Sequence, residues 1–370
     1  MSFTILRNVR ISNTVGGTSR TSSSVRMVAG WTDTVDAGRY AEFVKEQARF
    51  PNPPKRLSTL LRFLQHKGLS PVDPADRAGL NPFLVPLVKA RKENDDSGMV
   101  TGLLRWPTSP ETLDMPVVRN GESGLELLAN NAEHFIRRTV AEADFEGHSD
   151  AEASGDGYST KATSASLFEL IRLANDGLPG SDPIYEAGAV EKLGRGIMKY
   201  HALRVGQFPD VYEWLTASHL AKEDFTAALA SAERANEIFV GWGRPFGHYA
   251  RLLAGLPRRE MEAKDAAKVA LRCPCWTISP NYDDLEQVIK IAGYEDMASV
   301  RAMYVNMADD EQADMINEGK ATMQVALDRA AHLMDAVAFG HKGWDGVREE
   351  LAERYDQGGL PEIADFVRMT

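Results

Sequence analysis

The chain has 370 residues, of which 43% are apolar and 26% are charged, and its 53 acidic and 42 basic side chains give a formal net charge of −11. These values are typical of a folded globular protein, and they exclude a collagen, a coiled coil or a largely disordered chain as the class of this protein. The acidic balance argues against general nucleic-acid binding, because phosphate contacts require clustered Lys and Arg, and no apolar run approaches the roughly 18 residues of a membrane-spanning helix.

The first 32 residues differ in composition from the rest of the chain. They contain no Asp or Glu, four arginines and eleven Ser or Thr residues, and they offer no apolar run of the kind that a secretory signal needs. Such a segment is typical of an organelle transit peptide, and the stretch 25–29 resembles the cleavage region of plastid precursors. We expect a chloroplast location, in the stroma or at the thylakoid surface; a mitochondrial leader and a disordered cytosolic tail are the alternatives. Cleavage near Met27 would take the net charge from −11 to about −15.

Residues 33–143 are expected to form a smaller, mostly helical N-terminal region. Leucines at helical spacing predict a helix over 54–67, after a first helix over 36–50. Two short strands are expected over 100–106 and 115–119, and a further helix over 125–143. The basic side chains of the helix over 54–67 are interpreted as a solvated face, with peripheral contact to a membrane surface or an acidic partner as the alternative.

Residues 144–166 are rich in Asp, Glu, Gly, Ser, Ala and Thr. A segment of this composition buries too little apolar surface to offset the entropy lost on ordering. We therefore expect a flexible linker here, followed by an α-helical domain over 167–370.

Small residues recur every 35 positions in this second domain. The three triads are Ala228, Ala232 and Ala235; Ala263, Ala267 and Ala270; and Ala298, Ala302 and Val305. Pro245 and Pro280 are also 35 residues apart, each just before a helical stretch. Small residues at this spacing lie on one helix face and allow a neighbouring helix to pack closely.

A period of 34–35 residues with two helices per unit resembles the helical-hairpin repeats of the tetratricopeptide family. Leu215, the step Asp224-Phe225 and the first alanine triad occupy positions that match this family, whereas Thr216, Arg251 and Glu286 stand where it has a small residue. The resemblance covers about residues 209–308. It implies a mainly α fold of three stacked hairpins, with 191–204, 315–339 and 347–355 as flanking caps; an unrelated helical domain is the alternative.

The resemblance also implies a concave groove that binds a peptide or a protein surface. Carried onto this chain, the groove positions of the first helices are Asp210, Glu213, His248, Asp283, Gln287 and Lys290. The connector 241–245 is expected to be packed, and the hypothesis weighed against this is that Trp242 and Arg244 are exposed binding contacts. The carboxylate clamp of chaperone-binding members is not matched, so a C-terminal carboxylate is not the expected ligand.

No residue pattern indicates a catalytic site, a cofactor or a metal centre. Cys273 and Cys275 are too few for a structural zinc site, which takes four ligands, and are expected to be buried thiols beside Trp276; redox or metal chemistry is the alternative. The acidic run 309–314 lacks the spacing of a calcium loop. Zinc-helix, phosphate-loop and nucleophile-elbow motifs are missing from the sequence.

The leader, the 35-residue period and the lack of catalytic motifs favour a non-catalytic plastid scaffold or assembly factor that binds protein partners. Photosynthetic complexes are the expected clients, by analogy alone. Two alternatives remain open. One is an organelle RNA-binding protein of the pentatricopeptide type, which also repeats at 35 residues but needs a basic groove. The other is an enzyme with its site in the N-terminal region, near residues 103–106.

Overall fold

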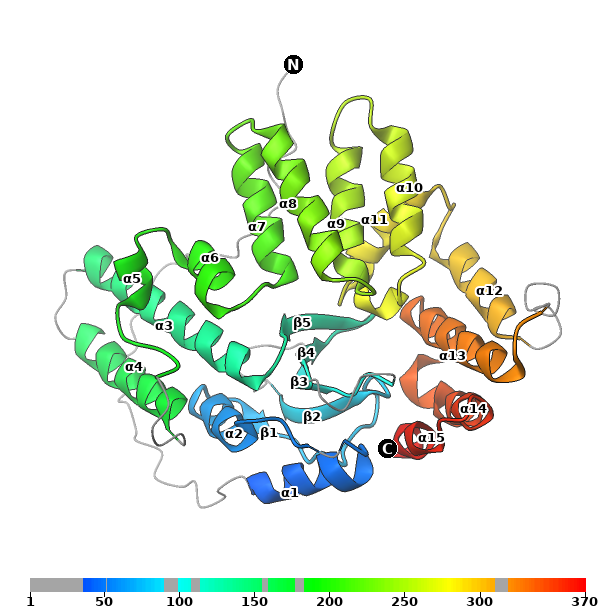
Figure 1. Ribbon diagram of the computed structural model, residues 1–370, viewed down its shortest axis with the longest axis horizontal. Helices are drawn as coiled ribbons and strands as arrows, with labels where there is room; N and C mark the ends of the chain where they lie inside the picture. The colour runs from blue at the N-terminus through cyan, green and yellow to red at the C-terminus, as the bar shows by residue number, and fades with distance from the viewer. Residues whose placement is uncertain are drawn as a thin grey trace, which may run out of the picture. The chain divides into compact units, whose positions relative to one another are not determined.

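A small antiparallel sheet lies at the centre of the folded part of the chain, with helices around it (Figure 1). The computed structural model describes residues 36–50, 52–89, 99–107, 114–154, 159–176, 183–309 and 319–370, and residues 36–370 form one unit. The predicted transit peptide, 1–32, falls outside the described residues. No helix in the described part of the chain is long and apolar enough to cross a membrane.

The sheet has the order β1-β2-β3-β4-β5, and every neighbouring pair is antiparallel. The strands are β1 (Ser70–Pro71), β2 (Leu84–Lys89), β3 (Val100–Leu104), β4 (Val117–Asn120) and β5 (Leu125–Ala129). Pro86 has no N–H to donate, and the register between β2 and β3 shifts between Pro86 and Val88. The two predicted strands are confirmed as β3 and β4. The expectation of a mostly helical N-terminal region was incomplete, since this region also forms three further strands.

The first helices lie where the leucine spacing predicts them. They are α1 (Ala37–Glu42), which continues into a π-helix η2 (Phe43–Gln47), and α2 (Leu57–His66). Leu57, Leu60, Leu61 and Leu64 are all buried on one face of α2.

The helix predicted over 125–143 begins later than expected. Leu125, Leu127 and Ala129 are buried and alternate with partly exposed residues, which is the period of a strand, and they pair with β4. Helix α3 (Ala132–Ser154) starts only after this strand, where the Asn131 side chain accepts a hydrogen bond from the His134 amide at 2.8 Å. The apolar residues of the strand happened to continue the helical spacing, which misled the prediction.

Much of the predicted linker is helical. Helix α3 extends to Ser154 and α4 (Ser159–Asn175) begins five residues later, and the two helices pack against each other. Ala and Glu both occur in this segment and favour helix even where the apolar content is low. The division of the chain into two domains at this segment remains a prediction.

Two helical hairpins follow the short helices α5 (Ala189–Leu193), α6 (Ile197–Tyr200) and η3 (His201–Val205). The first pairs α7 (Pro209–Leu220) with α8 (Phe225–Ile238), and the second pairs α9 (Gly243–Ala254) with α10 (Glu260–Ala270). They stand side by side above the sheet in Figure 1. All six alanines of the first two triads are buried, as predicted. The left-handed residue after the first helix also recurs every 35 positions, at Glu223, Arg258 and Gly293.

The third triad does not share this burial. After η4 (Cys275–Thr277) and α11 (Tyr282–Ala292), helix α12 (Met297–Ala308) begins two residues later than a 35-residue period places it. Ala298 and Ala302 are therefore exposed, and Val300, Tyr304 and Ala308 are buried instead. Helix α12 packs mainly on α13 (Thr322–Ala338), which leads to α14 (Gly343–Gln357) and α15 (Pro361–Arg368). A third hairpin in phase with the first two is thus not observed.

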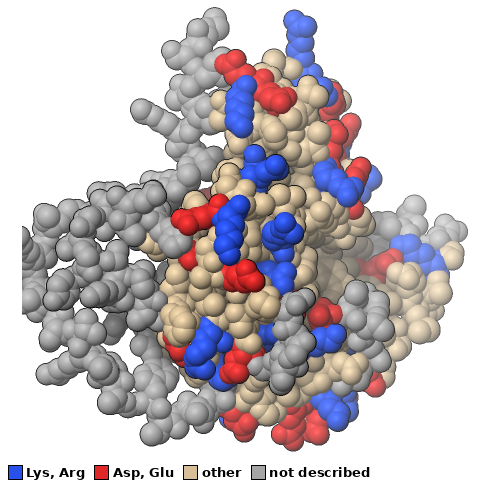
Figure 2. Space-filling view, turned by 60° about the vertical axis from the view of Figure 1, so that its left-hand side comes forward, with Lys and Arg blue, Asp and Glu red and all other residues tan. Residues whose placement is uncertain are grey.

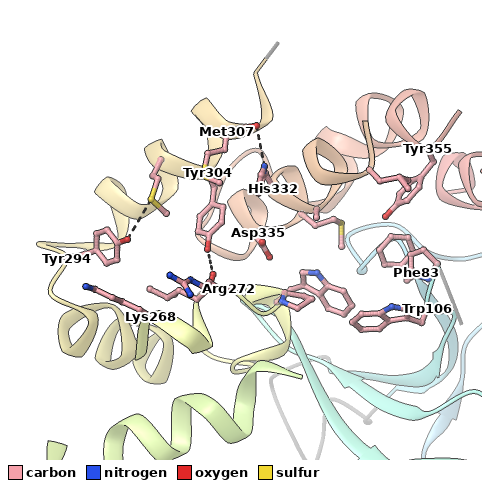
Figure 3. Close-up of a pocket in the computed structure, with 18 residues that line it drawn as sticks. Phe83, Trp106, Lys268, Arg272, Tyr294, Tyr304, Met307, His332, Asp335 and Tyr355 are labelled. Carbon is pink, nitrogen blue, oxygen red and sulfur yellow. Dashed lines mark hydrogen bonds between the residues drawn. The ribbon is translucent and has the colours of Figure 1, made fainter. Parts of the chain in front are cut away.

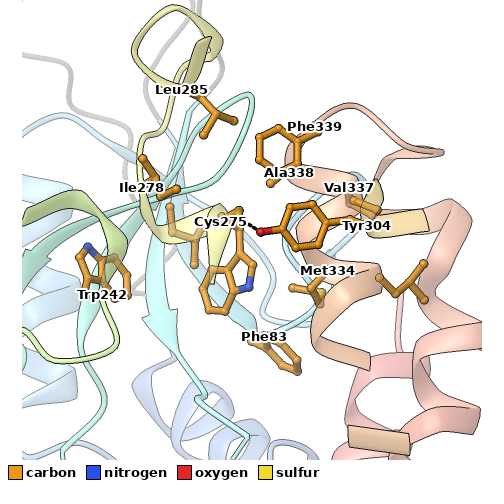
Figure 4. Close-up of a cluster of buried hydrophobic side chains, with 14 of the residues drawn as sticks. Phe83, Trp242, Cys275, Ile278, Leu285, Tyr304, Met334, Val337, Ala338 and Phe339 are labelled. Atoms are coloured by element: carbon orange, nitrogen blue, oxygen red, sulfur yellow. Dashed lines mark hydrogen bonds between the residues drawn. The ribbon is translucent and has the colours of Figure 1, made fainter. Parts of the chain in front are cut away.

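One apolar core joins the sheet to the helices. Phe83 and Leu104 from the sheet region, Trp242 and Trp276 from the loops that follow α8 and α10, and Tyr355 from α14 belong to the same buried cluster. Figure 4 shows part of it, with Phe83 and Trp242 on either side of the η4 segment and α13 beyond. The sheet and the helical hairpins therefore share their hydrophobic core.

Candidate functional site

The structure uses two of the predicted groove residues for internal ion pairs. Asp210 on α7 accepts hydrogen bonds from Arg138 of α3, at 3.1 Å for one of the two contacts. Glu213, one turn further along, is held by two nitrogens of Arg244 at 2.7 and 3.0 Å. The face that the repeat resemblance assigns to a ligand thus contacts α3 and α9 of the same chain.

Arg244 links the helical hairpins to the sheet. Besides Glu213, it donates to Glu126 of β5 at 3.0 Å, and Glu126 also binds Arg119 of β4. Burial alone would raise the pKa of Glu213, but the charge and hydrogen bonds of Arg244 outweigh it and lower that pKa from 4.5 to about 2. The network is therefore charged at neutral pH.

The connector 241–245 is packed, as expected, and the hypothesis of exposed binding contacts at Trp242 and Arg244 is corrected. Trp242 is only 7% exposed and lies in edge-to-face contact with Trp276 at 6.4 Å between ring centroids. The Gly243 amide donates to Thr277 Oγ1 at 2.7 Å, which fixes the connector against η4. A Cβ at residue 243 would lie 2.5 Å from Ile278, so only glycine permits this approach.

The remaining groove candidates separate into two groups. His248 is half-buried, and burial lowers its pKa. Asp283, Gln287 and Lys290 are exposed and lie at spacings of four and three on α11, so they share one helix face. Lys290 also pairs with Glu286 at 2.8 Å, an exposed contact of small energetic weight. The exposed face of α11 is the part of the predicted groove that solvent reaches.

A cavity of about 550 Å³ lies between α10, η4, α12, α13 and the end of β3 (Figure 3). Ligand pockets usually measure roughly 300–1,000 Å³. The aromatic residues Phe83, Trp106, Trp276 and Tyr355 line one end of it, and Trp106 and Trp276 lie 5.1 Å apart between ring centroids. Met303, Met307 and Met334 add side chains that adapt their shape to an apolar ligand.

Tyr304 forms a fixed wall of this cavity. Its hydroxyl donates to the Leu271 carbonyl and accepts from the Cys275 thiol at 3.3 Å (Figure 4). Its ring stacks on Phe339, with 5.5 Å between centroids and 14° between planes. Because the Tyr304 side chain is already fixed at its hydroxyl and at its ring, it loses little conformational freedom when a ligand binds.

Asp335 is a buried carboxyl group in the same cavity. Its Oδ1 accepts a hydrogen bond from the Cys275 amide at 2.6 Å. Burial raises its pKa from 3.8 to about 8, although the hydrogen bonds from Cys275 act in the opposite direction. At neutral pH this carboxyl is mostly protonated, and the interior of the cavity carries little charge.

Two cations lie at the other end of the cavity. Lys268 and Arg272 are exposed and four residues apart, at the end of α10, and Figure 3 places them on the same side as Tyr294. Within the described part of the chain, neither forms an ion pair with a carboxylate. The cavity thus has a cationic end and an aromatic end.

The two cysteines are free, and Cys275 is fully buried next to Trp276. Burial raises the pKa of Cys273 to about 11 and raises that of Cys275 as well. Thiols with raised pKa values are poor nucleophiles and poor metal ligands at neutral pH. The structure brings together no cluster of three or more metal-ligating side chains among the residues it describes.

Comparison with known proteins identifies the family. Three family models match: "PAB N-terminal" over residues 38–175, "PAB middle domain" over 209–295 and "PAB C-terminal domain" over 300–370. A protein of Arabidopsis thaliana is 34% identical over 334 residues, which cover 90% of this chain and 91% of that protein; it is named "Protein IN CHLOROPLAST ATPASE BIOGENESIS, chloroplastic". The chain belongs to the PAB family. No solved structure matches it.

The PAB segments agree with the observed architecture. The middle segment contains both hairpins and α11 and ends before α12, and the C-terminal segment covers α12 to α15. The boundary between these two segments coincides with the change in packing, since α12 packs mainly on α13. The predicted chloroplast location is confirmed by the homology to a chloroplastic protein.

The cavity residues were missed by the sequence analysis. Each PAB segment contributes to the lining, with Trp106 from the first, Lys268 and Trp276 from the second, and Tyr304 and Asp335 from the third. Residues that are more than 200 positions apart give no local pattern. Two stretches that contribute to the lining do stand out in the sequence, Leu103–Trp106 and Cys273–Trp276, but neither pattern indicates a cavity.

Proposed function

We propose that this PAB-family chain is a non-catalytic assembly factor that binds unassembled subunits of the chloroplast ATPase. The observation that carries the proposal is the 34% identity, over nine-tenths of both chains, to a protein whose name states a role in chloroplast ATPase biogenesis. Since the match includes all three PAB segments, the shared role belongs to the whole chain rather than to one module.

The chemistry of the cavity supports a binding role over a catalytic one. Asp335 and Tyr304 have hydrogen-bond partners within the chain, and the cysteine thiols have raised pKa values. An aromatic lining suits the apolar side chains that an unassembled subunit exposes. The mature charge near −15, and the intermingling of acidic and basic side chains on the face shown in Figure 2, disfavour the RNA-binding alternative.

We further propose that the partner also contacts the exposed face of α11, through Asp283, Gln287 and Lys290. The motivation is that two helical hairpins bury their alanine triads and leave this face of α11 exposed, although Asp210, Glu213 and Arg244 serve internal contacts. Binding would take place in the stroma or at the thylakoid surface.

Affinity isolation of the tagged mature chain from plastid extracts tests the proposal. We expect ATPase subunits to be enriched over a mock isolation from untagged plastids, and nuclease treatment to leave them bound. A chain with Ala302→Trp, an exposed change outside the cavity, serves as a folding control and should retain them equally. Recovery of RNA without ATPase subunits would instead support the pentatricopeptide-type alternative.

A further inference from the structure

We propose that the cavity between α10, α12 and α13 binds an apolar side chain of the partner whose neighbouring residues are acidic. This inference rests on the proposed function and adds the chemistry of the recognised segment. The occupant is a segment with an aromatic or large aliphatic anchor and at least two carboxylates within about one helical turn of it.

The aromatic end of the cavity is where the apolar anchor side chain of the partner would bind. Trp106, Trp276 and Phe83 present ring faces and edges to the empty volume, and Leu327 and Met334 complete an apolar surround. Burial of an aliphatic or aromatic side chain there removes apolar surface from water on both partners. The volume of about 550 Å³ exceeds the needs of a small side chain and favours a large one.

The cationic end accounts for the acidic neighbours. Lys268 and Arg272 line the cavity, and neither has a carboxylate partner among the residues described. Asp335 is the one acidic residue among those described in the lining, and its Oδ1 is bound to the Cys275 amide. On a chain of net charge −11, two unpaired cations beside an apolar cavity select an acidic segment.

Photo-crosslinking from the cavity tests the position and the chemistry together. The full mature chain, with a benzophenone amino acid at Ala331, is mixed with plastid extract, irradiated and examined by mass spectrometry. Ala331 is exposed and lines the cavity, and Ala302 is exposed on α12 without lining it, so a chain labelled at Ala302 is the matched control. We expect the label at Ala331 alone to reach an ATPase subunit, within an acidic segment that contains a large apolar residue.

The outcomes separate this inference from the proposed function. If ATPase subunits are isolated with the chain but crosslink equally from both positions, or crosslink through a basic or uncharged segment, the cavity inference is overturned and the assembly role stands. A crosslink at Ala331 to a lipid or another small molecule overturns it too. If no ATPase subunit is isolated, both proposals fail.

Charge reversal gives an independent measurement. The double variant Lys268→Glu/Arg272→Glu should bind the crosslinked segment, supplied as a synthetic peptide, about tenfold more weakly, since two exposed ion pairs are lost. Lys45→Glu/Lys199→Glu changes the net charge equally at two exposed sites away from the cavity and should change the affinity less than twofold. Equal loss in both variants would show a general charge effect and contradict the inference.

Filling the cavity gives a test that leaves the charges in place. Ala331→Trp places a large side chain at an exposed position of the lining, and we expect it to abolish peptide binding. Ala302→Trp makes the same change outside the cavity and should bind as the unaltered chain does. Undiminished binding by Ala331→Trp would contradict the inference.

Discussion

Arg244 ties the second hairpin to both α7 and the sheet. Its guanidinium binds Glu213 at 2.7 Å and Glu126 at 3.0 Å, and these three side chains are mostly buried. Replacing it by Met leaves Glu213 buried without this cation and leaves Glu126 with Arg119 alone, so Arg244→Met should lower the free energy of unfolding by about 3 kcal/mol. Denaturant unfolding measures this. Arg234→Met, which removes the exposed pair with Glu237, is the control and should change little.

Asp335 predicts a pH dependence of stability. Its pKa is raised from 3.8 to about 8 in the folded chain, so the folded state binds its proton more tightly than the unfolded state. The stabilisation is complete below pH 3.8 and is lost as the pH rises towards 8, by at most about 1.4 kcal/mol per pH unit. Asp335→Asn should flatten the dependence between pH 5 and pH 8. An unchanged slope in thermal or denaturant unfolding would show that Asp335 is ionised in the folded chain.

At the scale of elements, the alanine triads show which buried helix faces the sequence predicts and which it does not. The spacing correctly identified the buried faces of α8 and α10, because a period of 35 is a local property of the chain. It failed for α12, because this helix starts 37 residues after the start of α10 rather than 35, so a different set of its residues faces the core. The apolar spacing of residues 125–129 likewise predicts a helix, whereas the segment forms strand β5. Its pairing with β4 decides its conformation.

Larger side chains at two alanine positions test which of the three triads are buried. Ala267 of α10 is fully buried, and α10 packs on α9, whereas Ala302 of α12 is exposed. Ala267→Leu should lower the free energy of unfolding by about 1–3 kcal/mol, because the added atoms meet a close-packed helix interface. Ala302→Leu should be nearly neutral. If denaturant unfolding shows similar losses of unfolding free energy at the two positions, Ala302 lies at a packed helix interface as Ala267 does, and the third hairpin keeps the phase of the first two.

At the scale of the whole molecule, the sheet and the helical segments meet through glycines that the sequence did not single out. A Cβ at Gly124 would lie 2.1 Å from the Trp276 carbonyl oxygen, and one at Gly121 would lie 2.3 Å from that of Pro280. Ser123 between them donates to the Ser279 carbonyl at 2.9 Å. The candidate cavity likewise lies between segments that are distant in the chain, which explains why its residues could not be predicted from local patterns.

Gly124→Ala tests whether the PAB segments fold as one unit. If they share one core, tryptophan fluorescence and circular dichroism should show the same single unfolding transition. The variant should shift this transition as a whole and lower the free energy of unfolding by about 1–3 kcal/mol. Gly255→Ala, where a Cβ meets only ordinary contacts, is the control. Two separate transitions, of which only one responds, would support independent domains joined near 144–166.

The proposed assembly role is tested most directly by the amount of assembled ATPase in plastids that lack this chain. Native gels of solubilised thylakoids, with photosystems as the internal reference, measure it. We predict that the assembled enzyme falls several-fold relative to the photosystems, and that the unaltered chain restores it whereas Ala331→Trp does not. Normal amounts of assembled ATPase in its absence would contradict the account.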